Sequence, residues 1–293
     1  MKELCGVGLA LLLVGCDEPL KTVELIDEPR VLGARVEVEG EPERAAPEPG
    51  ERARARFLLA APEPLAQLGF ALLACPAAVR QGARSECAGE AFASVVSDAG
   101  LAEEASLDFE VPAELDPSGR VLVRGVLCPD TSPSVDGAGC QAGGAAKRVT
   151  LELDLSRADD VNHNPTLEPE AILFDGEPWS ELPPAAGECA GLGYAEVEVG
   201  SAHTLEVALD AADRDALPRP SKLDPSRESL QLSHFTTDGD LSRAFESVAW
   251  DSDALLRRAS WSAPAHTGLV RFWLVLRDFR GGSDFVQRAV CVR

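Results

Sequence analysis

The chain has 293 residues, a formal net charge of −22 at pH 7 and 45% apolar residues. Its 49 acidic against 27 basic side chains repel phosphate groups, which excludes nucleic acid as a partner. The same charge argues against peripheral binding to anionic lipid membranes, because such binding needs clustered basic residues. A chain of this length with this apolar content predicts two globular domains.

A short apolar run over residues 7–14 ends at Gly15-Cys16, and the residues after it turn polar at once. The run is too short to cross a bilayer as a helix, which needs about 20 residues, and a polar segment in this place is typical of the mature chain after a cleaved signal. Leu13-Val14-Gly15-Cys16 resembles the lipobox of bacterial lipoproteins. The resemblance implies cleavage after residue 15, lipidation of the Cys16 thiol and attachment to a membrane of the cell envelope.

Two other interpretations of this segment stay open: an ordinary secretory signal, and the buried first strand of a cytoplasmic protein. The choice of inner or outer membrane is open as well. Asp17 after Cys16 resembles an inner-membrane retention signal of some Gram-negative bacteria, but that rule varies between lineages. Residues 16–31 are expected to form a polar tether between the membrane and the folded part.

From residue 32 onward, apolar and polar residues alternate with period two, which predicts half-buried strands. In the first half the expected inward-facing sets are Ala34, Val36 and Val38; Ala53, Ala55 and Phe57; Leu107, Phe109 and Val111; and Val149, Leu151, Leu153 and Leu155. The runs 68–75 and 121–128 are nearly all apolar, as strands buried on both faces are. Residues 32–155 are therefore predicted to form one antiparallel β-sandwich.

Residues 156–164 are polar and are expected to be an interdomain linker, and residues 165–293 repeat the alternation of the first half. The inward-facing residues expected there are Leu205, Val207 and Leu209; Leu230 and Leu232; Val248 and Trp250; Ala259 and Trp261; and Val286, Val290 and Val292. The near-continuous apolar run 269–276 predicts a buried strand, and residues 279–283 predict a hairpin turn. Residues 241–256 are the best candidate for a short helix.

The second half resembles bacterial cadherin-like and PKD-like modules of the immunoglobulin fold. The segment 159–165, Asp-Asp-Val-Asn-His-Asn-Pro, is similar to the cadherin linker Asp-x-Asn-Asp-Asn-x-Pro. An acidic Asp-x-Asp motif at residues 213–215 follows a predicted strand, and residues 276–282 resemble the final hairpin of those modules. The resemblance implies an all-β protein with two consecutive immunoglobulin-like antiparallel β-sandwich domains.

Calcium binding is the most specific chemical property that this resemblance implies. The oxygen ligands it would offer are Asp159, Asp160, Asn162, Asn164, Asp213 and Asp215. Calcium takes six to eight oxygens, and His163 stands where the family has a ligating aspartate. The first half shows no matching acidic partners, and an acidic chain also produces such clusters as a solvated linker. No cofactor is therefore expected, with calcium the remaining possibility.

The cysteine count supports an oxidising compartment. Eight cysteines minus Cys5 and the lipidated Cys16 leave an even set, as disulfides require: Cys75, Cys87, Cys128, Cys140, Cys189 and Cys291. None has the CxxC-like spacing of a structural zinc site. If the strands ending at Cys75 and Cys128 pair antiparallel in one sheet, as in immunoglobulin-like folds, their ends lie at opposite edges. A bridge needs Cα atoms within about 7 Å, so the expected pairs are 75–87, 128–140 and 189–291.

Common catalytic signatures are absent from the sequence: it has no GxSxG, no P-loop in the mature chain and no HExxH. The four histidines, His163, His203, His234 and His266, show no close ligand spacing. His234 shares a face with Leu230 and Leu232, so we expect it to pack in the core. The chain is not expected to be an enzyme.

The tryptophans lie only in the second half. Trp273, inside the apolar run, is expected in the core, whereas Trp179, in the loop 175–184, is the expected exposed side chain that could stack on a sugar or anchor a partner. The sequence thus favours a lipid-anchored, non-catalytic envelope protein with a structural or partner-binding role, the partner being an envelope protein or a glycan. The alternative is a calcium-dependent adhesion or glycan-binding module.

Overall fold

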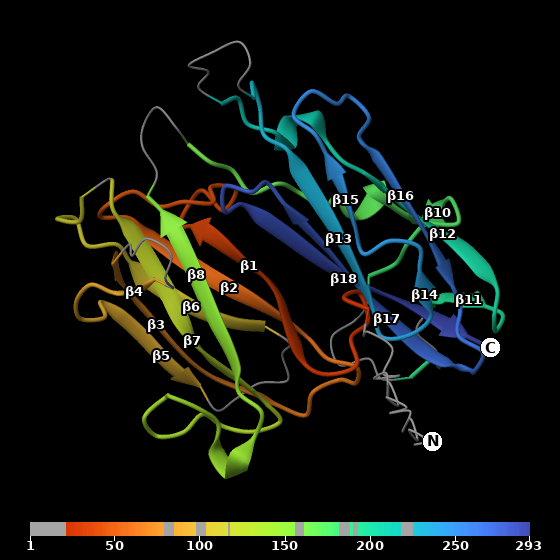
Figure 1. Ribbon diagram of the computed structural model, residues 1–293, viewed down its shortest axis with the longest axis horizontal. Coiled ribbons are helices and arrows are strands. Elements are labelled where there is room, and N and C mark those ends of the chain that lie inside the picture. The colour runs from red at the N-terminus through yellow and green to blue at the C-terminus, as the bar shows by residue number, and fades with distance from the viewer. Residues whose placement is uncertain are drawn as a thin grey trace, which may run out of the picture.

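The computed structural model describes residues 22–78, 85–97, 104–116, 118–155, 161–181, 188–189, 193–217 and 225–293. The protein is all-β, as the sequence predicts: its described helical segments are three short 3-10 turns. Two β-sandwiches lie side by side, the first red to green and the second green to blue (Figure 1). Cys16 and the rest of the lipobox lie outside the described residues.

The first sandwich packs a three-stranded sheet against a larger one. The small sheet has the order β1 (Arg30–Val38), β2 (Arg52–Ala60) and β6 (Glu104–Glu110). The larger has the order β4 (Glu86–Cys87), β3 (Leu68–Ala78), β7 (Arg120–Pro129) and β8 (Lys147–Asp154), with β5 (Ala93–Ser97) also paired to β3. All pairs are antiparallel. In β2, Ala53, Ala55 and Phe57 enter the core while arginines face outward, as the alternation predicts.

The second sandwich consists of two five-stranded sheets. One has the order β10 (Glu177–Pro178), β9 (Ile172–Phe174), β12 (Ala202–Ala208), β16 (Leu256–Ser262) and β14 (Asp240–Leu241). The other has the order β11 (Ala195–Val197), β18 (Ser283–Val292), β17 (Gly268–Arg277), β13 (Leu230–Thr236) and β15 (Phe245–Val248). β11 runs parallel to β18, an exception to the expected antiparallel pairing.

The short helix expected within residues 241–256 is wrong. The segment contains the strands β14 and β15 instead, and β15 pairs antiparallel with β13. Leu241 and Val248 enter the core of the second sandwich. Pairing with β13 and β16 satisfies the backbone of this segment, so tertiary context overrides its weak helical periodicity.

Residues 22–31 do not form the expected tether; residues 16–21 lie outside the described part. The Ile26 side chain is fully buried, and its backbone N–H donates to the carbonyl of Thr236 at 2.8 Å. The N–H of Thr236 donates in turn to the carbonyl of Glu24 at 2.9 Å. This segment therefore adds to the edge of the second sandwich before β1 begins, held by the buried Ile26 side chain and two backbone hydrogen bonds with Thr236.

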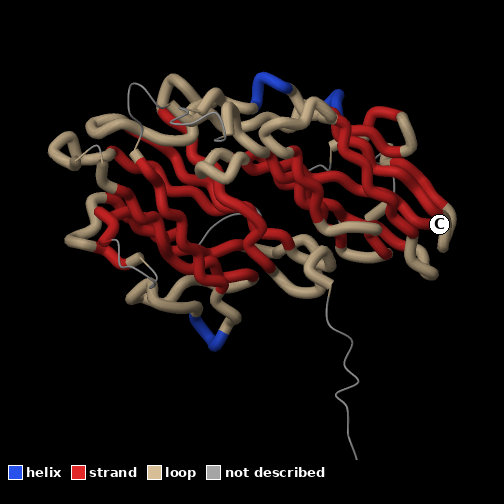
Figure 2. The backbone as a smooth tube through the Cα atoms, turned by 45° about the horizontal axis from the view of Figure 1, so that its top comes forward, coloured by secondary structure: helices blue, strands red, loops and turns tan. Residues whose placement is uncertain are grey.

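An apolar seam joins the two sandwiches. Its buried members come from both halves of the chain: Ile26, Leu32, Leu58, Ala60, Trp273 and Val275, with Phe235 and Phe285 packed against them. Figure 2 shows the strands of the two sandwiches close to one another near the middle of the molecule. Two sheet faces that would otherwise meet water therefore bury each other.

Polar side chains of the second sandwich cap the outer edge of β1. The carbonyl of Leu32 accepts from the Arg277 guanidinium, and that of Ala34 accepts from the Ser283 hydroxyl. The Asn164 amide donates to the carbonyl of Val36 at 2.6 Å. An edge strand normally leaves such groups open, so the second sandwich completes the edge of the first.

The three expected disulfides are confirmed. They join Cys75 to Cys87, Cys128 to Cys140 and Cys189 to Cys291, with Cα–Cα distances of 5.6, 5.5 and 5.5 Å. The first two each close a loop next to a strand of the larger sheet of the first sandwich. The third ties the segment before β11 to β18. Each of these bridges therefore lies within one sandwich, and none of the three crosses the seam between them.

Leu58→Ala tests the seam, because Leu58 is 2% exposed and belongs to the seam cluster. We expect the free energy of unfolding to fall by about 2–5 kcal/mol, with one transition shifting as a whole in guanidinium chloride. Val96→Ala, at a valine that is 64% exposed, serves as the control and should change the free energy by less than about 0.5 kcal/mol. Two separate transitions, with the second sandwich unaffected, would contradict the seam.

Candidate functional site

The predicted linker and acidic motif meet at one place, which we call the junction. It comprises Asn162, His163, Asn164, Asp213, Asp215, Glu228 and Asp278. Asp213 ends a 3-10 turn (Ala211–Asp213), Glu228 precedes β13, and Asp278 lies in the turn between β17 and β18. Residues 161–164 are therefore not a free linker but a structured strap between the two sandwiches.

Two buried asparagines fasten this strap. The side-chain amide of Asn162 donates to Oδ2 of Asp278 at 2.9 Å, and the backbone carbonyl of Asn162 accepts from the N–H of Ala45 at 2.9 Å. Asn164, besides reaching the edge of β1, accepts from the N–H of Ser283 at 3.1 Å. Each asparagine thus binds the first sandwich on one side and the β17–β18 hairpin on the other, Asn162 at Asp278 and Asn164 at Ser283.

The Asp278 carboxylate organises the turn between β17 and β18. It accepts from the N–H of Arg280 at 2.7 Å and from the N–H of Gly282 at 2.9 Å. A Cβ on residue 282 would lie 2.2 Å from Asp278 Oδ2 and 2.6 Å from the carbonyl of His163. Only glycine therefore lets the turn approach both the carboxylate and the strap.

A second chain of contacts runs from the strap to β13. His163 places its N–H and its Nδ1 at 2.9 and 3.0 Å from Oδ2 of Asp215. The N–H of Asp215 donates to Glu228 at 3.2 Å, and Glu228 accepts from Arg280 at 2.6 Å. The junction carboxylates are thus bonded to donors from the protein itself.

Burial gives the junction unusual electrostatics. Glu228 is 2% exposed, and its burial, with the charge of Asp278 nearby, raises its pKa to about 7. Burial also raises the pKa of Asp213 to about 6 and raises the pKa of Asp278. Protonated forms of these groups are favoured in the fold because the charged forms lose hydration.

The calcium ligands suggested by the resemblance are only partly brought together. Asn162, Asn164, Asp213 and Asp215 lie at the junction, but the Asn164 side chain bonds the backbone of Val36 and Ser283, and Asp159 and Asp160 lie outside the described residues. Within the described ranges, no group of three or more His, Cys, Asp or Glu side chains is arranged to hold a metal ion. The His163 imidazole contacts Asp215, which gives that carboxylate a protein partner instead.

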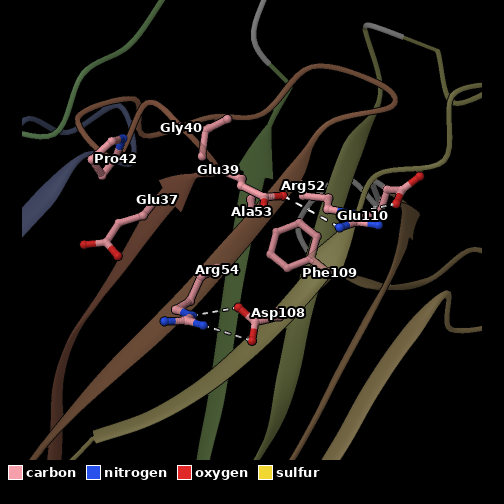
Figure 3. A pocket seen from close by; sticks show the side chains of 11 residues that line it. Glu37, Glu39, Gly40, Pro42, Arg52, Ala53, Arg54, Asp108, Phe109 and Glu110 are labelled. Carbon is pink, nitrogen blue, oxygen red and sulfur yellow. Dashed lines mark hydrogen bonds and ion pairs between the residues drawn. The ribbon is translucent and has the colours of Figure 1, made fainter.

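The outer face of the sheet β1-β2-β6 is a second candidate site, with a hollow of about 650 Å³. Figure 3 shows its charged rows, in which Arg54 points at Asp108 and Arg52 at Glu110. Arg54 reaches Asp108 at 2.7 Å, and Arg56 bridges Glu104 and Glu37 at 2.7 and 2.9 Å.

These arginines are occupied by neighbours across the sheet and leave little free charge for a ligand. Exposed pairs of this kind each stabilise a fold by at most about 1 kcal/mol. Their main effect is to make this face polar.

Trp179 is not the exposed recognition residue that its loop position suggests. Its side chain is 4% exposed, its indole N–H donates to the carbonyl of Ala289 at 3.0 Å, and its ring packs against Phe174 and Phe272. The short strand pair β9–β10 folds it into the second sandwich. The expectations for Trp273 and His234 are confirmed: both are buried, and burial lowers the pKa of His234 to about 4.

Sequence reasoning missed Glu228, Asp278 and the seam. Asp278 lies in the segment 276–282, which the sequence predicts to be a hairpin. The glycines at 281 and 282 were the available signal that the turn after Asp278 is tight. Glu228 carries no local signal, because its burial depends on segments distant in sequence.

Compared with known protein families and with curated proteins, the chain matches no family model and no curated protein. Among the described residues, none of the helical segments has the length and apolar character needed to cross a bilayer.

Glu228→Gln tests the electrostatics of the junction. The pKa of Glu228 rises from 4.5 to about 7 in the fold, so its stabilising protonated form is complete below about pH 4.5 and is lost as the pH rises through 7. We expect the free energy of unfolding to fall by roughly 1–3 kcal/mol between pH 5 and pH 8, and the neutral glutamine to reduce that slope.

Urea denaturation at pH 5, 6, 7 and 8 measures this effect. Glu114→Gln, at an exposed position of the first sandwich, provides the control and should run parallel to the wild type. A slope that Glu228→Gln leaves unchanged would show that Glu228 does not titrate as its burial implies.

Proposed function

We propose that this protein is a lipid-anchored, non-catalytic component of the bacterial cell envelope. In this role it presents two joined immunoglobulin-like sandwiches for structure or for binding an envelope partner. The proposal includes lipidation of Cys16 and removal of residues 1–15, on the strength of the lipobox resemblance. The anchor would comprise several acyl chains, since a single chain binds membranes only marginally.

The observation that carries this proposal is the set of three disulfides. They use every cysteine from residue 75 to the end of the chain and leave none free. Such bonds form and persist in oxidising compartments, which include the bacterial periplasm and the cell surface. If the chain is exported, the position of Cys16 directly after the apolar run 7–14 and Gly15 favours the lipoprotein interpretation over an ordinary secretory signal.

The buried carboxylates support a structural role for the junction. A raised pKa often marks a catalytic acid or base, but structural networks perturb pKa values too. Here Glu228 and Asp278 hold Arg280, Asn162 and backbone amides in place. Their positions fix the two sandwiches relative to each other, which suits a rigid module held away from a membrane.

Cys16→Ser tests the anchor. The variant lacks the thiol that accepts lipid, so we expect an uncleaved or soluble form that leaves the detergent phase in a phase-partitioning assay. Cys5→Ser is the matched control, because Cys5 lies in the segment that processing would remove. Unchanged partitioning of the Cys16→Ser protein would refute the proposed anchor.

The alternative function is a calcium-dependent adhesion or glycan-binding module. The observation in its favour is that Oδ1 of Asn162 and Oδ2 of Asp213 are buried without a hydrogen-bond partner among the described residues. Against it, Asp215 and Asp278 already accept from His163, Asn162 and backbone amides.

We predict that calcium does not stabilise the protein, because a cation would have to displace those donors. Thermal melting in millimolar calcium and in excess chelator should give midpoints within about one degree of each other; a ΔΔG of 1 kcal/mol shifts a domain of this size by only about 2–4 °C. A rise of several degrees in calcium would favour the adhesion module over the structural role.

A further inference from the structure

An open groove lies between β1 and β8, the edge strands of the two sheets of the first sandwich. Two adjoining hollows of about 500 and 700 Å³ make it up, and both are lined by Val31, Arg148 and Thr150. We call their union the β8 groove. Its floor includes Phe57, Val149 and Leu151 from the core of the first sandwich. An apolar core thus reaches a hollow bordered by strand edges.

The two edges that border the groove differ in one respect. The outward carbonyls of β1 are capped by Arg277, Ser283 and Asn164. β8 is the terminal strand of its sheet and pairs only with β7 among the described residues. Its outward peptide groups therefore offer a row of donors and acceptors to an added strand.

Phe279 stands at the mouth of the groove in an unusual conformation. Its side chain is 64% exposed, and its φ of 67° lies in the left-handed region that bulky residues avoid. The other described non-glycine residues with positive φ are aspartates, which tolerate it better. Strain of this kind persists where surrounding structure imposes it, and it clusters at functional sites.

The charge of the groove runs against that of the protein. Its basic side chains are Arg30, Lys147, Arg148 and Arg277, against Glu28 and Glu152. Lys147 pairs with Glu28 at 3.4 Å, and Glu152 pairs with Arg120 at 3.7 Å. Arg148 is exposed and has no hydrogen-bond or ion-pair partner among the described residues. In a chain of net charge −22, an unpaired arginine at an open strand edge favours an acidic occupant.

We propose that the β8 groove accepts an extended segment of a partner protein, in which apolar residues alternate with acidic ones, as an added strand on β8. The apolar side chains enter the groove over Val31 and Leu151, and Phe279 packs across them. The acidic side chains lie along Arg148. Main-chain hydrogen bonds to β8 give the affinity, and the alternation gives the specificity. This inference gives the partner-binding half of the proposed function a site, and it does not depend on the lipid anchor.

A fluorescein-labelled decapeptide of alternating valine and glutamate is the probe, titrated against the full-length protein in detergent and followed by fluorescence anisotropy. We expect saturable binding below 1 mM (on the order of the weakest affinities that such an assay can measure), with hydrogen-exchange protection of the amides of β8. A peptide N-methylated at every second residue and a valine–lysine peptide should not bind. No binding by the glutamate peptide, or equal binding by the N-methylated one, would overturn the proposal.

Three variants assign the roles of the side chains. Arg148→Glu should weaken binding at least tenfold, whereas Arg124→Glu should change it less than twofold. Arg124 is the matched control because it is exposed and has no hydrogen-bond or ion-pair partner among the described residues, but it lies on β7 outside the groove lining. Phe279→Gly should also weaken binding at least tenfold while leaving the melting temperature unchanged or higher, because glycine adopts this φ without strain.

A lower melting temperature for Phe279→Gly would make Phe279 a structural residue and overturn its assigned role. Equal losses from Arg148→Glu and Arg124→Glu would reduce the effect to net charge and also overturn the proposal. Analytical ultracentrifugation of the protein alone tests the alternative that a second copy of the chain occupies the groove. A dimer that the glutamate peptide does not dissociate would favour that alternative and overturn the proposal. Because none of these measurements depends on Cys16, their failure is distinguishable from failure of the anchor.

Discussion

The cover that the second sandwich provides over β1 is the constraint on which the rest of the structure depends. An uncovered β1 would expose unpaired carbonyls, and the seam residues Leu32 and Leu58 would meet water. Arg277, Ser283 and Asn164 satisfy the carbonyls, while Trp273 and Val275 cover the apolar face. The same packing draws Ile26 into the seam and converts the expected linker into a strap. We therefore expect the two sandwiches, which follow one another in the sequence, to unfold as one unit.

The junction shows how groups of the protein itself satisfy acidic side chains that a sequence resemblance points to as calcium ligands. Asn162, Asp213 and Asp215 correspond to positions that resemble a calcium-binding linker and motif. In this chain the asparagine amide and the His163 imidazole contact the carboxylates directly. Burial then raises the pKa of Glu228 and of Asp278. Hydrogen bonds from the protein therefore occupy carboxylate oxygens at this place in the fold.

Much of the fold could be predicted because period-two alternation directly reports which face of a strand is buried. The inward sets of β2, β6 and β12 follow it, and the disulfides follow from strand ends and loop lengths. The failures share one physical cause. Segments distant in sequence bury Ile26, Trp179 and Glu228, so no local sequence pattern indicates that these side chains are buried. Of the candidate site, the sequence pointed to the aspartates and asparagines but not to Asp278 or the open edge of β8.

Native-state hydrogen exchange tests most directly whether the two sandwiches form one unit. The most protected amides of β1 and those of the β17–β18 pair can be compared by their opening free energies across a denaturant series. Our account predicts that both sets exchange through the same global opening, with equal free energies and equal denaturant dependence. A separate, lower-energy opening of β1 while β17 and β18 stay protected would contradict it.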